Sequence, residues 1–573
     1  MQRILSTLLI IIFQFAFFVI HSAAQPKFAG KVQKGIFSIN TYDKQNNLIH
    51  QGTGFYVGQN GEAVASYAVF KNAAKATVID AAGKQYDVDC VLGADDTYSL
   101  VRFRVATKGN AVLNTSSAAQ SKGTTMYALG FSNSGTAQSD VSAVSDTVMI
   151  DGKYVYYALG KVMDEKLIGA PVFNADGTLV GIMHAPIGEK SYVLDIRFRE
   201  VLKMEAIPTR SASVALGNIF LPKGLPDTAE EALVYTYFHS RTTSNEEYMG
   251  MMNRFVTTFP QNAEGYLRRA TPLIDMLRFD EADADLQKYM SLVEDKASGN
   301  YNTASTIFNK LNILPEPEYS KWTYDLVLDY VNKAISLNDA KSDAPEEKKV
   351  HDTQYKILKA QALMGKKNYD EAIGIYESLN VGADRNAAYF YAISTAREER
   401  GDSAGAVVEM LDSAIAQFSE PMPREAANYV LRRGQILANC GRYRDAVKDY
   451  NQYCYLMNNQ VSAVFHYERY QIESNARLFQ QALDDINSAI EKAPRVPLYY
   501  VEKASLCIRV NMLDECIEAC QMAIALSPDI IDSYRILGYA QLQKGDKATA
   551  RQNIQKAIDM GDENAKTILE KYF

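Results

Sequence analysis

The chain has 573 residues and carries 60 lysine and arginine side chains against 68 aspartate and glutamate side chains, which gives a net charge of −8. A chain of this length is too long for one hydrophobic core, so we expect two or more domains. The acidic balance lacks the basic surface that nucleic-acid binding requires, and we expect no nucleic-acid partner.

Residues 1–24 predict a secretory signal peptide. Arg3 precedes an apolar run from Leu8 to Ile20, and the segment ends in the small residues Ser22, Ala23 and Ala24. This order is typical of a signal sequence that is cleaved after small residues, here near Ala24. We therefore expect a periplasmic or secreted mature protein, with a single membrane span as the alternative interpretation. No later apolar run is long enough to cross a bilayer, so we expect no membrane span after cleavage.

Residues 25–206 predict an all-β domain. Between about Phe28 and Leu202, short runs rich in Val, Ile, Tyr and Phe alternate with turns that contain Gly and Asn. Examples are KGIFSINTY, GTGFYVG and GTLVGIMHA. Because β-branched and aromatic residues favour strands, this regular turn spacing indicates a barrel or a sandwich.

The composition changes after Pro208. The stretch TRSASVALGNIFLPKGLPDT is polar and contains Pro and Gly, and we interpret residues 207–227 as a linker. From residue 228 onward the apolar period becomes helical and the chain repeats itself. We therefore place an all-helical domain at residues 228–573.

Pairs of small residues mark the helical repeats. From Ala372 onward the second member of each pair recurs at intervals of 34 to 40 residues, and residues 291–350 are irregular. Small residues at such positions let two antiparallel helices approach closely. The pattern resembles the tetratricopeptide repeat, which implies an α-solenoid. The second members are Ala282, Ala372, Ala406, Ala446, Ala482, Cys516 and Ala550, and twelve residues before them lie Ala270, Ala360, Ser394, Gly434, Tyr470, Ala504 and Gly538.

The β domain resembles trypsin-like proteases, in particular the short bacterial type exemplified by the HtrA family. Five segments match in order: GTGFYVGQNGEAVASYAVF, GADDTYSLVRFRV, GTTMYALGFSNSG, EKLIGAPVFNADGTLVGI and SYVLDIRFREVL. The resemblance implies a multidomain chain in which an all-β trypsin-like double barrel precedes an all-α tetratricopeptide-repeat solenoid.

The resemblance also implies where a catalytic triad would lie. The histidine position falls on Ala68, the aspartate position on Tyr98 and the serine position on Ile168, and the glycine of the oxyanion hole falls on Lys166. Hydroxyl attack needs a base within hydrogen-bond reach and donors for the developing oxyanion. These four residues offer neither, so we predict that the domain is not an enzyme.

Four other residues have side chains that could take part in catalysis or metal binding. Ser66 lies beside the lost histidine position and His184 follows an apolar strand, and we interpret both as structural. Cys516 and Cys520 are four residues apart on one helix face, but no histidine or third ligand accompanies them. We interpret them as buried apolar side chains, and we expect no metal and no cofactor.

The first helix of each repeat is expected to line a groove that binds a protein or peptide partner. Residues one and five positions after the small site, and three before it, share the inward face. Tyr, Asn and Gln on that face suit an extended peptide. The predicted groove residues are Tyr391, Gln435, Asn439, Tyr467, Gln471, Asn475, Ser505, Arg509, Arg535, Tyr539 and Gln543.

These patterns favour an exported, non-catalytic protein-binding scaffold or assembly factor of the bacterial envelope. Its protease-like cleft could still hold an extended segment by strand addition. The alternative is a serine-type peptidase of trypsin-like fold that uses a non-standard catalytic residue. A third hypothesis is that the β domain only caps the repeats.

Overall fold

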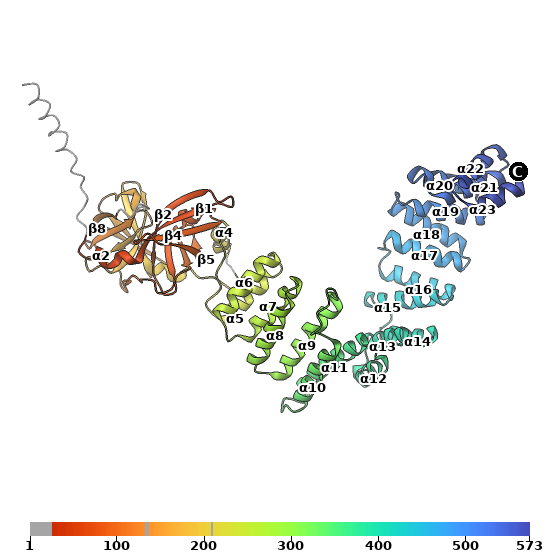
Figure 1. Ribbon diagram of the computed structural model, residues 1–573, viewed down its shortest axis with the longest axis horizontal. Helices are drawn as coiled ribbons and strands as arrows, with labels where there is room; N and C mark the ends of the chain where they lie inside the picture. The colour runs from red at the N-terminus through yellow and green to blue at the C-terminus, as the bar shows by residue number, and fades with distance from the viewer. Residues whose placement is uncertain (1–25, 132–136, 208–209) are drawn as a thin grey trace, which may run out of the picture. The chain divides into compact units, whose positions relative to one another are not determined.

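The structure is a computed structural model that describes residues 26–131, 137–207 and 210–573 (Figure 1). The predicted signal peptide and its cleavage point near Ala24 lie outside the described residues. The chain divides into two compact units, one that ends at Glu294 and one that runs from Asp295 to Phe573.

The first six strands close into an antiparallel barrel, in the order β1-β2-β3-β6-β5-β4. Short elements α2 (Ala29–Val32) and η1 (Gln33–Gly35) precede it, and α3 (Tyr67–Phe70) follows the third strand. The strands are β1 (Ile36–Tyr42), β2 (Leu48–Tyr56), β3 (Glu62–Ser66), β4 (Lys75–Asp80), β5 (Gln85–Asp95) and β6 (Leu100–Val105).

The next six strands close into a second antiparallel barrel, in the order β10-β11-β12-β9-β8-β7. The 3₁₀ turns η2 (Glu165–Leu167) and η3 (Ile196–Val201) precede β10 and follow β12. The strands are β7 (Thr125–Phe131), β8 (Ala137–Ile150), β9 (Tyr154–Leu159), β10 (Pro171–Phe173), β11 (Leu179–Ile187) and β12 (Lys190–Asp195).

The two barrels share a hydrophobic core. Phe55 and Leu100 of the first barrel pack in one cluster with Phe173, Leu179 and Leu194 of the second, and all five side chains are fully buried. Removal of so much apolar surface from water stabilises the barrel pair. The predicted double barrel is therefore present, and its two halves form one packed body.

The stretch that the sequence predicts as a linker packs against the first barrel. It contains α4 (Arg210–Gly217), and the backbone after this helix hydrogen-bonds to the barrel, with Val91 N donating to Pro222 O at 2.9 Å and Gly224 N donating to Val91 O at 2.7 Å. Ile219 and Leu221 are almost fully buried. This part of the chain is thus an ordered extension of the barrel.

Two helical pairs complete the first unit. They are α5 (Ala229–His239), α6 (Asn245–Thr258), α7 (Ala263–Asp275) and α8 (Phe279–Leu292). Met252 and Phe255 of α6 belong to the same hydrophobic cluster as Val91 and Phe103 of the first barrel. Arg254 on α6 also donates from Nη1 to Asp89 Oδ2 at 2.7 Å, so the barrel and the first helices are continuous.

The second unit is all helical, and successive helices pack in antiparallel pairs. The helices are α9 (Lys296–Ile313), α10 (Tyr324–Asp339), α11 (Pro345–Gly365), α12 (Tyr369–Leu379), α13 (Ala387–Arg400), α14 (Ala404–Ile415), α15 (Ala427–Asn439), α16 (Tyr443–Leu456), α17 (Ala463–Asn475), α18 (Phe479–Lys492), α19 (Pro497–Arg509), α20 (Leu513–Leu526), α21 (Ile531–Gln543), α22 (Lys547–Asp559) and α23 (Glu563–Tyr572).

Small residues lie where the paired helices touch. A Cβ atom added at Gly538 on α21 would be 2.6 Å from Ile554 Cγ1 on α22, and one added at Gly434 would be 3.0 Å from Asp449 Cβ. Side chains of ordinary size would force these helices apart. The predicted pairing of small residues is therefore confirmed at these two contacts.

Ala406 is the exception in the predicted register, since it is only half-buried while the next residue, Val407, is buried. The turn before α14 is one residue longer than in the neighbouring repeats. Helix α14 begins three residues after Gly401, whereas α16 begins two residues after Gly441. The residue of α14 that packs inward is consequently Val407, one residue later than predicted.

A residue with positive φ ends the first helix of the repeats. It lies seven residues after the small position in each case. Glycine, which adopts a positive φ without steric strain, occupies this position in some of the repeats. The N–H of the following residue then bonds to a carbonyl of the last helical turn, as in Arg442 N to Leu437 O at 2.8 Å. The residues are Leu277, Lys367, Gly401, Gly441, Arg477, Asn511 and Gly545.

Arginine on the first helix of three repeats ties that helix to its neighbours. Arg433 on α15 contacts Asp449 on α16 of the same repeat, with Nε to Oδ2 at 2.9 Å and Nη2 to Oδ1 at 2.7 Å. Its Nη1 also donates to Asp412 on α14 of the preceding repeat at 2.6 Å. The same arrangement holds for Arg269 with Asp285 and Asn253, and for Arg469 with Asp485 and Asn451.

Candidate functional site

The loop that carries Ile168 lies at the junction between the two barrels. In this loop η2 begins after Asp164 and leads into Gly169, whose φ is +82°. A Cβ at Gly169 would lie 3.3 Å from Ser66 Cβ and 3.5 Å from Thr53 O of the first barrel. The loop of one barrel therefore lies directly against β2 and β3 of the other.

Backbone N–H groups in this loop already have acceptors within it or beside it. Lys166 N donates to Asp164 Oδ1 at 3.0 Å, and Ile168 N donates to Glu165 O at 3.1 Å. Gly169 N donates to Met183 O at 2.8 Å. An oxyanion needs preorganised donors that face it. In this conformation the Lys166 N–H is bonded to the capping carboxylate of Asp164, and the Ile168 N–H closes the 3₁₀ turn.

Ala68 lies in α3, next to the same junction between the barrels. Its methyl group is exposed, whereas its neighbours Tyr67 and Phe70 are buried. Tyr67 Oη donates to Ala215 O at 3.2 Å, which ties α3 to the segment that packs on the first barrel. The local backbone is thus firmly held, but the side chain at this position has no atom that could accept a proton.

Tyr98 lies in the turn between β5 and β6. Its N–H donates to Asp95 Oδ1 at 2.7 Å, and its ring packs on Phe198 of η3 with centroids 4.7 Å apart. Phe198 also packs edge-on against Tyr154, at 5.5 Å. An aromatic contact between the barrels thus occupies the place where the resemblance implies a carboxylate.

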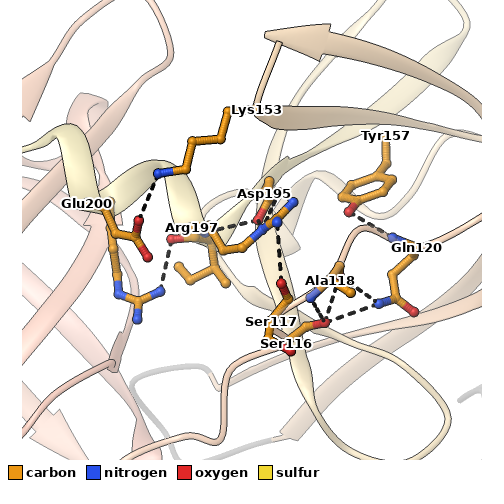
Figure 2. A network of polar contacts seen from close by, with 11 residues as sticks. Ser116, Ser117, Ala118, Gln120, Lys153, Tyr157, Asp195, Arg197 and Glu200 are labelled. Atoms are coloured by element: carbon orange, nitrogen blue, oxygen red, sulfur yellow. Dashed lines mark hydrogen bonds and ion pairs between the residues drawn. The ribbon is translucent and has the colours of Figure 1, made fainter. Parts of the chain in front are cut away.

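A polar network holds η3 in position (Figure 2). Asp195 begins this turn and accepts from Arg197 Nε at 2.9 Å, and Arg197 Nη1 donates to Ser117 O at 3.4 Å. In the same view Gln120 N donates to Tyr157 Oη at 3.1 Å. Because Asp195 is nearly fully buried, its pairing with arginine offsets the cost of burying its charge. The network fixes the backbone from which Phe198 reaches Tyr98.

The hydroxyl groups of Ser66 and Ser99 and the imidazole of His184 lie near this junction. Ser66 Oγ, nearly fully buried, is 3.1 Å from Ser99 Oγ. Both ring nitrogens of His184 are buried near the backbone of Tyr98, but neither makes a hydrogen bond of normal geometry with the described residues. Burial lowers the pKa of His184, so its neutral form is favoured. The hydroxyl pair thus satisfies itself, and the imidazole packs edge-on against Tyr156.

The predicted groove residues of the second unit lie on the first helices of five successive pairs. Tyr391, Asn439, Gln471, Asn475, Arg509 and Gln543 are exposed, whereas Gln435, Tyr467, Ser505, Arg535 and Tyr539 are partly buried.

Ring contacts show that consecutive first helices lie side by side. Tyr391 on α13 meets Tyr429 on α15 at 5.5 Å, and Tyr467 on α17 meets Tyr499 on α19 at 5.1 Å. Tyr467 Oη also donates to Glu502 on α19 at 3.4 Å. The predicted residues therefore share a continuous face where these helices adjoin.

The two predicted groove arginines differ in their surroundings. Arg535 donates from Nε to Asp562 Oδ2 at 2.6 Å and also pairs with Asp532, so its charge is neutralised within the chain. Arg509 is exposed and lies over the ring of Phe479 at 5.1 Å. Arg509 is therefore the better placed of the two to meet a partner.

Sequence reasoning missed several residues on this face. Val464 and Leu498 occupy equivalent places in α17 and α19, and their side chains are 57% and 46% exposed. They flank the Tyr467–Tyr499 contact, so apolar area adjoins the polar groove residues. Their position six residues before the small site was visible in the sequence.

The buried cysteines carry no sign of a metal site. Cys516 and Cys520 lie in one hydrophobic cluster with Cys507, and all three are fully buried. Across residues 26–131, 137–207 and 210–573, no group of three or more His, Cys, Asp or Glu side chains is arranged to hold a metal ion.

Two antiparallel six-stranded barrels that pack on each other, followed by paired helices, define a trypsin-like domain joined to a helical-repeat array. Residues 52–182 match the family model of the trypsin-like peptidase domain. A solved structure, the active form of the Rv3671c protease from M. tuberculosis, is 14% identical with a TM-score of 0.28, and the match covers 31% of this chain and 82% of that one.

Curated relatives include tetratricopeptide-type proteins. The mitochondrial import receptor subunit TOM70 of Rattus norvegicus is 21% identical over 298 residues, which are 48% of this chain and 47% of the receptor subunit. The DnaJ protein P58IPK homolog A of Oryza sativa subsp. japonica is 28% identical over 127 residues, 22% of this chain and 24% of that protein. The anti-sigma-I factor RsgI9 of Acetivibrio thermocellus is 26% identical over 151 residues, 26% of this chain and 21% of that protein. The chain spans less than half the length of these relatives.

Within the part of the chain that the structure describes, none of the helices combines the length and the apolar character that a bilayer span requires.

Proposed function

We propose that the protein is an exported scaffold or assembly factor of the bacterial envelope, which binds a protein or peptide partner and does not cleave it. The observation that carries the non-catalytic part is the use of the Lys166 and Ile168 N–H groups inside η2, at 3.0 Å and 3.1 Å from their acceptors. Because these two N–H groups are already bonded, they offer no donor to a tetrahedral oxyanion.

The side chains at the three triad positions support the same proposal. Ile168 has no lone pair for attack and Ala68 has no imidazole to take a proton, so neither step of acyl transfer has a group to perform it. Tyr98 packs on Phe198, so an aromatic ring and not a carboxylate occupies the position that would orient a base. Restoring one position alone would leave the others missing.

The helical half supports binding. First helices that adjoin through Tyr467 and Tyr499 present a face on which Asn475 and Gln471 are exposed beside apolar Val464. Amide groups can exchange hydrogen bonds with an extended backbone, and rigid tyrosines add contact area at low entropy cost. Repeat arrays generally expose such long surfaces.

Export is part of the proposal and rests on the sequence of residues 1–24. Amino-terminal sequencing of the protein recovered from the periplasm or medium would test it. We expect a mature chain that begins near Gln25. Recovery of the intact first segment in the cytoplasm would contradict export.

The absence of peptidase activity can be tested directly. The full chain is incubated with fluorescent casein and with a serine-directed fluorophosphonate probe, next to an active serine protease as positive control. We expect neither cleavage nor labelling. Because the Ser66 and Ser99 hydroxyls lie beside the junction of the barrels, the variants Ser66→Ala and Ser99→Ala are included, and labelling that one of them abolishes would support the peptidase alternative.

Groove binding can be tested by photo-crosslinking in the native envelope. A photoreactive amino acid is placed at Asn475 on the predicted groove face, and in a matched control at Lys448, whose side chain is 77% exposed on the second helix α16. We expect one crosslinked partner at position 475 that is absent at position 448. That crosslink should disappear when Asn439 and Arg509 are both changed to alanine, with an unchanged circular dichroism melt. Equal crosslinking at both positions would reject the groove.

A further inference from the structure

A pocket that does not include the Ile168 loop lies within the first unit. It has a volume of about 650 Å³ and is bounded by the segment that follows α4 and by helices α5 and α6. This volume is in the range of small-molecule sites, roughly 300–1,000 Å³. Its wall is mainly apolar and includes Met204, Leu216, Ile219, Phe220, Leu221 and Met251.

One ammonium group is held inside this apolar wall. Lys223 Nζ donates to Ile219 O at 2.6 Å and to Leu221 O at 2.8 Å. An ammonium has three donor hydrogens, so the two carbonyls leave one hydrogen for a further acceptor. Burial lowers the pKa of Lys223 to about 8, which shows that its charge is poorly solvated in this place.

The other charged groups of the pocket are already paired or exposed. Arg254 donates from Nη1 to Asp89 Oδ2 at 2.7 Å. His239 Nδ1 is 2.9 Å from Tyr235 O, so the proton of a neutral ring lies on Nδ1. Glu246 and Glu247, in the first turn of α6, are exposed, and the negative charge of Glu247 partly offsets the effect of burial on the pKa of Lys223. Lys223 is thus the group that an added anion would meet inside the pocket.

We propose that this pocket binds a fatty acid, with the carboxylate on Lys223 and the alkyl chain along the apolar wall. One charge and one available hydrogen match a carboxylate, which is a monoanion. A phosphate dianion is a poorer match, because the wall is mainly apolar and Glu246 and Glu247 bring negative charge to the same pocket. The alkyl chain would cover the apolar wall that Phe220, 46% exposed, now leaves partly open to water.

The test of the head group uses equilibrium dialysis of the full chain with radiolabelled palmitate. We expect saturable binding of one palmitate per chain, and Lys223→Met should weaken it roughly 10- to 100-fold, the range of a charge-assisted hydrogen bond. The matched control is Lys203→Met, which removes a lysine whose side chain is 59% exposed. The control should bind as the wild type does. Hexadecanol should bind the wild type no better than palmitate binds the Lys223→Met variant.

The test of the cavity uses Gly250→Leu. Gly250 lines the pocket from α6, and a Cβ there would meet no atom within 4 Å, so leucine extends into the open space without strain. We expect loss of palmitate binding with a melting temperature that is not lowered, because leucine favours helices over glycine. Gly374→Leu, at an equally open helical position on α12, is the matched control and should bind normally. Unsaturable binding by the wild type, or equal binding by Lys223→Met or Gly250→Leu, overturns the proposal.

Discussion

Replacement of Glu473 by glutamine is expected to remove a loss of stability that develops in the wild-type protein as the pH rises. Glu473 on α17 is 3% exposed, and its Oε1 is 3.9 Å from Arg469 Nε. Arg469 is already engaged with Asp485 of α18, which also lies 2.8 Å from His466 Nδ1. Burial, and then the negative charge of Asp485, raise the pKa of Glu473 to about 8.

The sign of the pH effect follows from this raised pKa. In the unfolded chain the Glu473 carboxyl has its ordinary pKa of 4.5. Between about pH 5 and pH 8 the folded form therefore holds a proton that the unfolded form has released. Stability is highest at the acidic end and falls as the pH rises, by at most about 1.4 kcal/mol per pH unit, which is tenfold in the unfolding equilibrium.

Hydrogen exchange measured by mass spectrometry on peptides from α17 and α18 tests this prediction. The full-length wild type and Glu473→Gln are compared at pH 6 and again at pH 8, so that intrinsic exchange rates cancel within each pair. We expect the amides of the variant to exchange more slowly than those of the wild type. The ratio of the two exchange rates should grow by up to about 100-fold between pH 6 and pH 8. Glu491→Gln, at an exposed site on α18, should show no such growth. An equal factor for Glu473→Gln at both pH values would refute the reasoning.

Three further substitutions test how the repeats pack, with urea unfolding followed by circular dichroism as the measurement. Gly538→Val places a side chain 2.6 Å from Ile554 and should destabilise the protein by about 1–3 kcal/mol. Arg433→Met leaves Asp449, whose side chain is 6% exposed, without its bidentate partner, and should cost about 3–5 kcal/mol, most of it recovered when Asp449 is changed to leucine as well. Arg477→Gly relieves a φ of +62° and should stabilise the protein by about 1 kcal/mol; a loss of stability there would contradict the backbone argument.

The fold could be predicted from the sequence because its signals are periodic. Runs of β-branched and aromatic residues between Gly and Asn turns marked the strands, and small residues such as Gly434 and Gly538 lie where helices touch. The turn position seven residues after each small site was also visible, since Gly401 and Gly441 share it. It could not reveal the longer turn that displaces Ala406, because Gly401 and Gly441 both lie five residues before the predicted small site.

Contacts across the sequence were harder to predict. The tract 207–227 has the composition of a linker, but its apolar residues Ile219 and Leu221 are buried in the first unit. Likewise no local pattern showed that Asp562 neutralises Arg535. Nor did one show that the N–H groups of Lys166 and Ile168 are bonded to Asp164 and Glu165. Such pairings depend on tertiary geometry, so sequence spacing does not reveal them.

The packing of residues 218–225 on the first barrel determines how the molecule can be dissected. Truncation at residue 206 would strip Ile219, Leu221 and Leu225 from the barrel and expose apolar surface on both fragments. Loss of partner capture by such a fragment would then report misfolding or aggregation, not loss of recognition. A division between Glu294 and Asp295 keeps each compact unit whole, so fragments divided there can reveal which half of the protein recognises its partner.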